Sequence, residues 1–239
     1  MRAKSPENIE VEIEYLKREY GIQALSLHDE IGIPLNREQA ISRLEVFSRT
    51  GMIWKGQCRV DGVTPELAKL MRESGCVAMG LGVESASQYT LDLINKKINV
   101  EKSKETIKIL KDNGIAPRIY MIMGLPGEPE NISEVTWNFI QETQPDAVFM
   151  HLFTPRPGTE VYDHREKFGI RLTDEHWSKN NHLFYAGDHP SITFEYEETT
   201  PWGKARRPEK IVAEYTVLLE KLQEAGFSPY PPKRKEDQN

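Results

Sequence analysis

Hydrophobic positions along the first two thirds of the chain follow two alternating spacings. Apolar residues three and four positions apart predict amphipathic helices, which open with capping residues and mostly close at a glycine. The predicted helices cover residues 6–20, 36–50, 64–74, 87–94, 100–113 and 131–142. Short apolar runs between them predict strands at 22–27, 52–61, 76–83, 119–123 and 147–152. Strands separated by helices indicate crossover connections and a parallel sheet.

The loops after the predicted strands concentrate polar residues and glycine–proline turns. In barrels built from strand–helix units, functional side chains gather on these loops. The pattern therefore favours a TIM-like barrel over an open, doubly wound sheet. Because the first predicted element is a helix, no strand precedes the first crossover. The expected fold class is α/β, a partial barrel that lacks its first strand.

The pattern changes near residue 170. Residues 171–205 are rich in Asn, His, Asp, Thr and Trp, and helical spacing returns only at 208–225. We therefore expect a partial barrel over 1–170 and an irregular, α-containing C-terminal extension over 171–239. Within the extension, residues 228–239 carry three prolines and a charged end, a composition that predicts disorder.

The overall composition is that of a folded protein, with 38% hydrophobic residues, 28% charged residues and a formal net charge of −6. The sequence has no apolar run near the roughly 20 residues that a membrane helix needs, and no apolar N-terminal stretch. We therefore expect a cytoplasmic protein without membrane association. The excess of acidic residues argues against general nucleic-acid binding.

The chain contains two cysteines, Cys58 and Cys76. Two cysteines exclude a disulfide framework and any metal site that needs three or four thiolates from this chain. Both lie in predicted strands, where a cysteine packs as a small apolar residue. We therefore expect both thiols in the core.

Six short motifs occur in order, most of them at predicted strand ends. They are Ser5-Pro6-Glu7-Asn8, His28-Asp29-Glu30, Arg59-Val60-Asp61, Gly82-Val83-Glu84-Ser85 with Asn95-Lys96, Gly124-Leu125-Pro126-Gly127-Glu128, and Thr154-Pro155-Arg156-Pro157-Gly158-Thr159. In this order they resemble the radical SAM superfamily, and most closely its branch of cobalamin-binding-domain proteins and methylthiotransferase-like enzymes. The resemblance covers roughly residues 2–170. The family fold, a partial (β/α)6 barrel, agrees with the predicted elements.

The resemblance implies S-adenosylmethionine (SAM) and a 4Fe-4S cluster held by three thiolates of a Cys-x3-Cys-x2-Cys loop. In the family, an open iron position takes the amino and carboxylate groups of SAM, whose sulfonium is cleaved to a 5′-deoxyadenosyl radical. This sequence lacks the loop, and Met1 falls where the family's first helix begins. We therefore expect a truncated protein that cannot ligate the cluster alone. A separate N-terminal segment or subunit and an electron donor are the expected partners, and a cobalamin would require an upstream domain.

The remaining SAM motifs map onto residues of this sequence through the same resemblance. His28-Asp29-Glu30 takes the position of the motif that receives the methionyl ammonium, a cation suited to carboxylate and carbonyl oxygens. Arg59 would direct its guanidinium at the ribose or the carboxylate of SAM. The ordinary alternatives are a solvated acidic turn and a surface ion pair.

The later motifs map in the same way. Glu84 and Ser85 match the strand end that contacts the ribose, and Lys96 matches a basic position that binds the methionine carboxylate. Gly124 and Leu125 belong to a turn that brings the backbone close to the adenine, which glycine permits because it has no Cβ. Helix capping, a solvent-facing lysine and a plain tight turn are the structural alternatives.

Three functions follow from these observations. The first is SAM-dependent radical chemistry, such as methylation, methylthiolation or rearrangement of an unknown substrate, if an upstream cysteine loop completes the chain. The second is a non-catalytic remnant or binding partner that keeps the barrel and part of the SAM groove. The third is a barrel enzyme in which Asp29, Glu84 and His151 hold a divalent metal.

Overall fold

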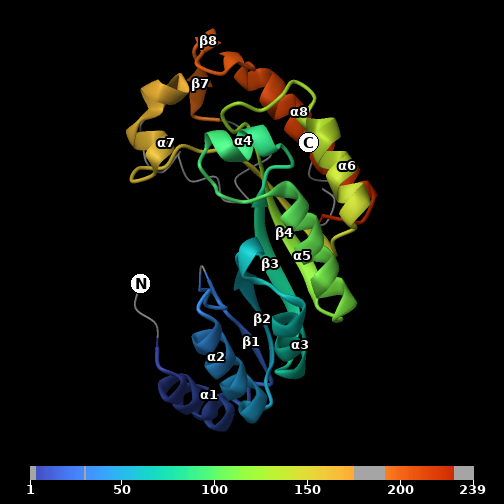
Figure 1. Cartoon of the computed structure of the whole chain (residues 1–239). Helices are drawn as coiled ribbons and strands as arrows, with labels where there is room; N and C mark the ends of the chain where they lie inside the picture. Colours follow the sequence, from blue (N-terminus) through green and yellow to red (C-terminus); the bar gives the residue numbers. More distant parts are fainter. Residues whose placement is uncertain (1–3, 30, 175–191, 229–239) are drawn as a thin grey trace, which may run out of the picture. The chain divides into compact units, whose positions relative to one another are not determined.

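The computed structural model describes residues 4–29, 31–174 and 192–228 of the chain (Figure 1). A five-stranded parallel sheet has the strand order β1-β2-β3-β4-β5. Its strands are β1 (Ala24–Ser26), β2 (Ile53–Cys58), β3 (Cys76–Glu84), β4 (Ala116–Met123) and β5 (Ala147–Leu152). The strands follow one another in the sheet in chain order, each reached through helical or loop segments. This arrangement confirms the predicted α/β class and partial barrel.

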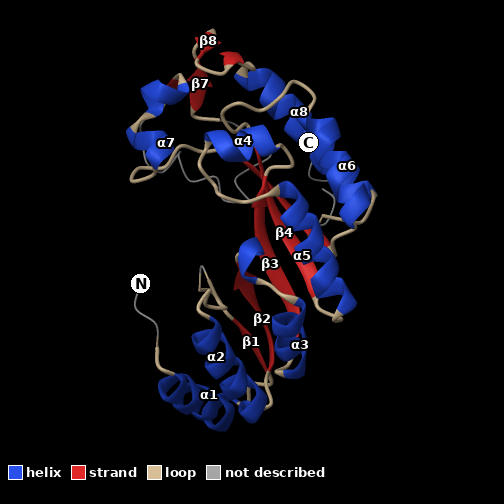
Figure 2. Ribbon diagram, in the orientation of Figure 1, coloured by secondary structure: helices blue, strands red, loops and turns tan. Residues whose placement is uncertain are grey.

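One helix precedes the first strand of this sheet and the others follow its strands along the chain; Figure 2 colours helices blue and strands red. They are α1 (Pro6–Tyr20), α2 (Arg37–Thr50), α3 (Pro65–Glu73), α4 (Gln88–Leu93), α5 (Val100–Asp112) and α6 (Ile132–Thr143), with a short 3-10 turn η1 (Val60–Gly62) after β2. The predicted bounds of the longer helices agree to within about two residues, because local caps define their ends. The Asn36 side chain, for example, accepts a hydrogen bond from the Gln39 amide at 3.0 Å at the start of α2.

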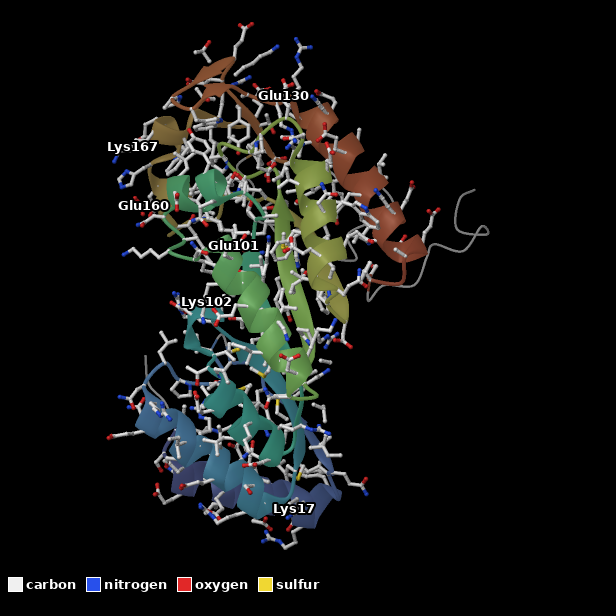
Figure 3. All side chains as sticks on the ribbon, turned by 45° about the vertical axis from the view of Figure 1, so that its right-hand side comes forward. Lys17, Glu101, Lys102, Glu130, Glu160 and Lys167 are labelled. Carbon is white, nitrogen blue, oxygen red and sulfur yellow. The ribbon has the colours of Figure 1, made fainter. Side chains whose placement is uncertain are left out.

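The chain divides into two compact units whose boundaries fall inside β3 and β4. Unit 1 comprises residues 1–82 and 101–119, and unit 2 comprises residues 83–100 and 120–239. In unit 1, α1 packs on α2 and α2 on α3. Lys17, labelled in Figure 3, donates from α1 to the Thr50 carbonyl at the end of α2 at 2.9 Å.

The core of unit 1 is centred on Trp54 of β2. The centroid of its ring lies 5.0 Å from that of the Phe47 ring of α2, and its Nε1 donates to the Ser74 carbonyl at 2.9 Å. The indole is 1% exposed, so both its apolar body and its polar N–H are satisfied inside the protein. This core fixes the N-terminal strands of the sheet.

Unit 2 contains the elements that follow the sheet. These are α7 (Glu160–Asp163), the 3-10 turn η2 (Arg165–Phe168), the antiparallel pair β6 (Ile170–Leu172) and β7 (Phe194–Tyr196), the pair β8 (Thr199–Thr200) and β9 (Gly203–Lys204), and α8 (Pro208–Glu224). The sequence pattern predicted α8. It missed β6, β8 and β9, because strands of two or three residues are too short to show a period.

Residues after position 170 share a core with the ends of the sheet strands. Leu125, Phe153, Ile170 and Phe194 form one buried cluster, and α8 packs on α6, β5 and β7 (Figure 1). At the end of α8, the Phe227 carbonyl accepts from the Val148 amide of β5 at 2.8 Å. The described part of the C-terminal extension is therefore integrated into unit 2. Among the described residues, no helix combines the length and the apolar character that spanning a membrane requires.

Candidate functional site

The strand ends of unit 1 present polar side chains to solvent. His28 and Asp29 follow β1 and are exposed, and Glu30 lies outside the described residues. The same loop returns to the sheet at Gly32, whose amide donates to the Gln57 carbonyl at 2.7 Å. A Cβ at this position would stand 3.1 Å from that carbonyl oxygen, so the close approach favours glycine.

Arg59 follows β2 and forms a two-pronged ion pair with Asp61. Its Nε and Nη2 donate to the two carboxylate oxygens at 2.9 and 2.8 Å. These hydrogen bonds hold the pKa of Asp61 below its usual value. The guanidinium proposed for the ribose or carboxylate is thus occupied by a neighbour two residues away, and it would have to exchange partners to meet a ligand.

In unit 2, Glu84 ends β3 and pairs with Lys96. Lys96 Nζ lies 2.7 Å from Glu84 Oε1, and the two side chains are 37% and 16% exposed. Glu84 adopts a left-handed backbone conformation with φ 66°, which is uncommon for a residue with a side chain. Ser85 is buried, and its hydroxyl accepts from the Ser87 amide at 3.2 Å just before α4. The two residues assigned to ribose and to methionine carboxylate therefore form one ion pair.

The segment after β4, residues 124–128, is a buried turn that we call the β4 turn. The Gly124 amide donates to both carboxylate oxygens of Glu128, at 2.9 and 2.8 Å. Arg206 Nη1 donates to Glu128 Oε2 at 2.7 Å, and Arg206 Nη2 donates to Glu214 Oε2 at 2.5 Å. The Glu128 and Arg206 side chains are 2% and 5% exposed. A buried ionic network therefore lies directly against the turn.

Two further residues of the C-terminal region contact Gly124. The Tyr196 hydroxyl of β7 donates to the Gly124 carbonyl at 2.7 Å. Gly124 has φ 94°, and a Cβ there would stand 3.1 Å from Ile211 Cγ2 of α8. The close approach that this glycine permits is, in this structure, an approach of α8. Leu125, the other residue assigned to this turn, places its side chain in the cluster with Phe153 and Phe194.

Burial shifts the pKa values of several groups in unit 2. Burial raises the pKa of Glu128 to about 7, against the opposing influence of Arg206 and the Gly124 amide. Burial also raises the pKa of Tyr196 well above its usual value, so its hydroxyl remains a donor. The pKa of His151 in β5 falls to about 4, mainly through burial and further through Arg156.

Sequence reasoning missed Arg206, Tyr196 and Glu214. They lie 72 to 86 residues after Gly124 or Glu128, in a region without a recognisable motif. The one available signal was Glu128 itself, because a carboxylate inside an apolar turn requires a partner. Within residues 4–29, 31–174 and 192–228, two buried side-chain atoms make no hydrogen bond, Arg206 Nε and Thr154 Oγ1.

The cysteines of the chain do not fit a three-thiolate cluster. Cys58 and Cys76 are buried in β2 and β3, as predicted, and both are free. Burial raises the pKa of each thiol to about 12, which favours the neutral form over the thiolate that metals bind. In the described part of the chain, no three His, Cys, Asp or Glu side chains are grouped as a metal site requires.

Comparison with known proteins places the chain in a family. The sequence profile of the radical SAM superfamily matches residues 1–136. The anaerobic magnesium-protoporphyrin IX monomethyl ester cyclase of Rubrivivax gelatinosus is 30% identical over 165 residues, which cover 67% of this chain and 30% of the cyclase. An uncharacterized methyltransferase of Pyrococcus horikoshii is 30% identical over 180 residues, or 74% of this chain and 39% of that protein. The chain thus spans about a third of the length of these relatives.

Solved structures share the fold. The radical S-adenosylmethionine methyltransferase TsrM from Kitasatospora setae, a structure with cobalamin and a 4Fe-4S cluster bound, matches with a TM-score of 0.70 at 14% identity. The match covers 99% of this chain and 50% of that chain. These findings confirm the resemblance read from the six motifs. With its partial barrel, its ordered motifs and a profile match over more than half its length, the chain belongs to the radical SAM superfamily.

Proposed function

We propose that this chain supplies the SAM-binding barrel of a radical SAM enzyme in the branch that includes methyltransferases and methylthiotransferases. The observation that carries the proposal is the position of its motif residues. Asp29, Arg59 and Gly124 follow β1, β2 and β4, and Glu84 is the last residue of β3. These are successive strands of one parallel sheet. Loops at the carboxyl ends of such strands are where barrels bind their ligands.

Each residue has a chemical role in this proposal. His28, Asp29 and Glu30 receive the methionyl ammonium, for which Asp29 offers an exposed carboxylate. Arg59 exchanges Asp61 for an oxygen of the ribose or the carboxylate of SAM. Bound SAM supplies the activated methyl or adenosyl group of the reaction.

The Glu84–Lys96 pair forms the second part of this proposal. Glu84 accepts from the ribose hydroxyls, and Lys96 pairs with the methionine carboxylate. At 37% exposure, the Lys96 side chain has room to turn toward a ligand while remaining near Glu84. Ser85 holds the strand end through its bond to Ser87. The pair thus keeps both charges balanced before SAM arrives.

The cluster ligands come from outside this chain in the proposal. Two buried, neutral thiols cannot replace three thiolates. Within the described residues, β1 is an outermost strand of the sheet, and an unpaired strand edge accepts another strand readily. A separate N-terminal segment or subunit that carries the cysteine loop would pair there. An electron donor completes the system, and a cobalamin would be held by a further domain.

The reaction class that the relatives favour is methylation. One relative is named a methyltransferase, as are others at 26% and 28% identity, and another is named a cyclase. The substrate of this chain is not specified by its residues. A divalent-metal barrel enzyme is not favoured, because the family match is to the radical SAM superfamily. A non-catalytic binding partner is the second candidate, and the second test below distinguishes it from an enzyme component.

The first test is calorimetric titration of the full chain with S-adenosylhomocysteine. We expect saturable binding of one ligand per chain, weakened at least about tenfold in Glu84→Gln because a half-buried carboxylate that accepts from two hydroxyls is lost. Glu101→Gln is the matched control, since its carboxylate is 76% exposed on α5 (Figure 3). Absence of binding at millimolar ligand would overturn the proposal.

The second test separates an enzyme component from a binding partner. Anaerobic reconstitution of the chain alone with iron and sulfide should give no stoichiometric cluster. Mixing the chain with SAM, a one-electron reductant and a peptide or subunit that bears a Cys-x3-Cys-x2-Cys loop should give cluster absorbance and SAM cleavage if the chain is an enzyme component. Retained S-adenosylhomocysteine binding with no cleavage in any such mixture would favour the binding partner.

A further inference from the structure

The peptide groups around Gly124 are held from two directions by side chains. The Gly124 amide donates to Glu128, four residues along the chain, at 2.9 and 2.8 Å. The Gly124 carbonyl accepts from the Tyr196 hydroxyl at 2.7 Å. Both polar groups of this residue are therefore occupied by bonds that fix how its two peptide planes face.

The Glu128 carboxylate is itself held by the C-terminal region. Arg206, between β9 and α8, donates to Glu128 and to Glu214 of α8. Glu214 also accepts from the Ser133 hydroxyl at 3.4 Å, and Lys210 Nζ lies 3.8 Å from its other oxygen. Because Arg206 and Glu128 are both almost fully buried, each would be left with an uncompensated charge without the other.

We infer that Tyr196 and Arg206 are positioning residues for the nucleoside side of the SAM site. They set the orientation of the Gly124 and Leu125 backbone that the proposed function assigns to the adenine, and the inference rests on that function. It adds a role for residues after position 170, which no family motif covers.

The physical reason is the freedom of glycine. At φ 94° Gly124 occupies a region that residues with a Cβ avoid, and a glycine peptide moves among several such conformations at little cost. The bond from Tyr196 and the Arg206–Glu128 pair select one of them before a ligand arrives. A backbone already in its bound orientation loses less conformational freedom on binding, which raises affinity.

The first arm of the test measures the turn directly, without ligand. Tyr196→Phe removes the hydroxyl and keeps the ring that packs 5.2 Å from Phe194. The matched control is Tyr215→Phe, because the Tyr215 hydroxyl also donates to a backbone carbonyl, that of Met150, at 3.1 Å. We expect hydrogen exchange of a peptide covering the β4 turn to rise severalfold in Tyr196→Phe and to stay at the wild-type rate in Tyr215→Phe. Equal exchange in all three proteins would overturn the inference.

The second arm measures binding with two probes, S-adenosylhomocysteine and 5′-methylthioadenosine. The turn is assigned to the nucleoside, which both probes contain, so Tyr196→Phe should weaken both by the same factor of about three to ten. Tyr215→Phe should bind both as wild type does. Arg206→Lys keeps the positive charge but loses the guanidinium that donates to Glu128 and Glu214 at once. It should therefore weaken the binding of both probes at least as much as Tyr196→Phe.

The outcomes separate the inference from the function beneath it. If the wild type binds both probes and Tyr196→Phe binds them equally well, the inference is overturned and the proposed function stands. A loss confined to S-adenosylhomocysteine would also overturn the inference, because the defect would lie on the methionine side. If the wild type binds neither probe, the proposed function fails and takes the inference with it.

Discussion

The strand ends of unit 1 and the β4 turn of unit 2 hold their polar groups in different ways. After β2, Arg59 pairs with Asp61, two residues away, and the side chains are 34% and 44% exposed. At the β4 turn, Glu128 pairs with Arg206, 78 residues away, and neither side chain is more than 5% exposed. The Arg59–Asp61 pair joins near neighbours in the sequence and is exposed to water. The Glu128–Arg206 pair joins distant residues and is buried.

The difference concerns what each pair can do for a ligand. An exposed ion pair contributes about 0–1 kcal/mol and can exchange partners with little loss. A buried pair is costly to break, because removing one partner leaves the other charge buried with neither water nor an opposite charge to stabilise it. The strand end of unit 1 is therefore suited to release its arginine to a ligand. The β4 turn is suited to hold one shape.

The largest expected effect comes from breaking the buried pair. Arg206→Met fills similar volume but removes the cation from Glu128 and leaves Glu214 only Lys210, at 3.8 Å, so the free energy of unfolding should fall by about 3–5 kcal/mol. Urea denaturation near neutral pH measures it. Arg59→Met is the control, with an expected loss of about 1 kcal/mol or less. Equal losses in the two variants would contradict the contrast between the regions.

The next effect is a pH dependence that belongs to the β4 turn. Burial raises the pKa of Glu128 from 4.5 to about 7 in the fold, so the folded state binds this proton more tightly than the unfolded state. The free energy of unfolding should therefore fall as pH rises from about 4.5 through 7, by about 3 kcal/mol at most. Arg206, Glu214 and Tyr196 are the titratable groups around it.

The comparison of wild type with Glu128→Gln isolates this contribution. The variant should show a flatter profile of unfolding free energy between pH 5 and about 7.5, because its side chain does not titrate. The low pKa of His151 has the opposite effect, because it lowers the free energy of unfolding as pH falls from 6.5 toward about 4. Both proteins contain His151, so its effect cancels when the two profiles are subtracted. Parallel profiles for the two proteins would show that Glu128 keeps its ordinary pKa.

A smaller effect is expected from the turn backbone. Gly124→Ala places a methyl group in a left-handed conformation and 3.1 Å from Ile211 Cγ2, so we expect a loss of about 2 kcal/mol. Gly158→Ala is the matched control, since Gly158 has φ 81° and no atom within 4 Å of a built Cβ. Its loss should be about 1 kcal/mol. Thermal unfolding of both variants measures the difference, and a larger loss at Gly158 would count against crowding by α8.

The smallest effect is expected at the strand end of unit 1. Arg59 lowers the pKa of Asp61, so the pair's contribution is present above pH 3.8 and is lost as pH falls through the lower folded-state pKa. Because both side chains are about a third exposed or more, Asp61→Asn should cost about 0.5 kcal/mol or less near neutral pH. Urea denaturation with and without added salt checks it. A loss above about 2 kcal/mol would remove the distinction between the two regions.

The sequence predicted features whose determinants lie close together along the chain. Caps such as Asn36 defined helix ends, and the six motifs predicted the fold and the family before any contact was seen. The resemblance to the family singled out Glu84 and Lys96, although their pairing with each other became visible only in the structure. Local patterns sufficed because neighbouring residues determine local geometry.

The bonds from Tyr196 and Arg206 could not be predicted in the same way. They join residues 72 and 78 positions apart, and the helix and strand periods that sequence analysis uses extend over less than about twenty residues. Arg206 lies between Lys204 and Arg207, which are exposed, yet its own side chain is 5% exposed. Only the packing of β7 and α8 on the end of the sheet brings these groups to Gly124.

The separation of Arg206 from Glu128 also has a consequence for protein synthesis. A ribosome makes the β4 turn long before it makes the arginine that neutralises the glutamate beneath it. Until Arg206 emerges, Glu128 must stay hydrated or protonated, because burying an unpaired carboxylate is costly. The turn therefore cannot bury Glu128 in its charged form before then. The final shape of this turn is thus acquired only after Arg206 has left the ribosome.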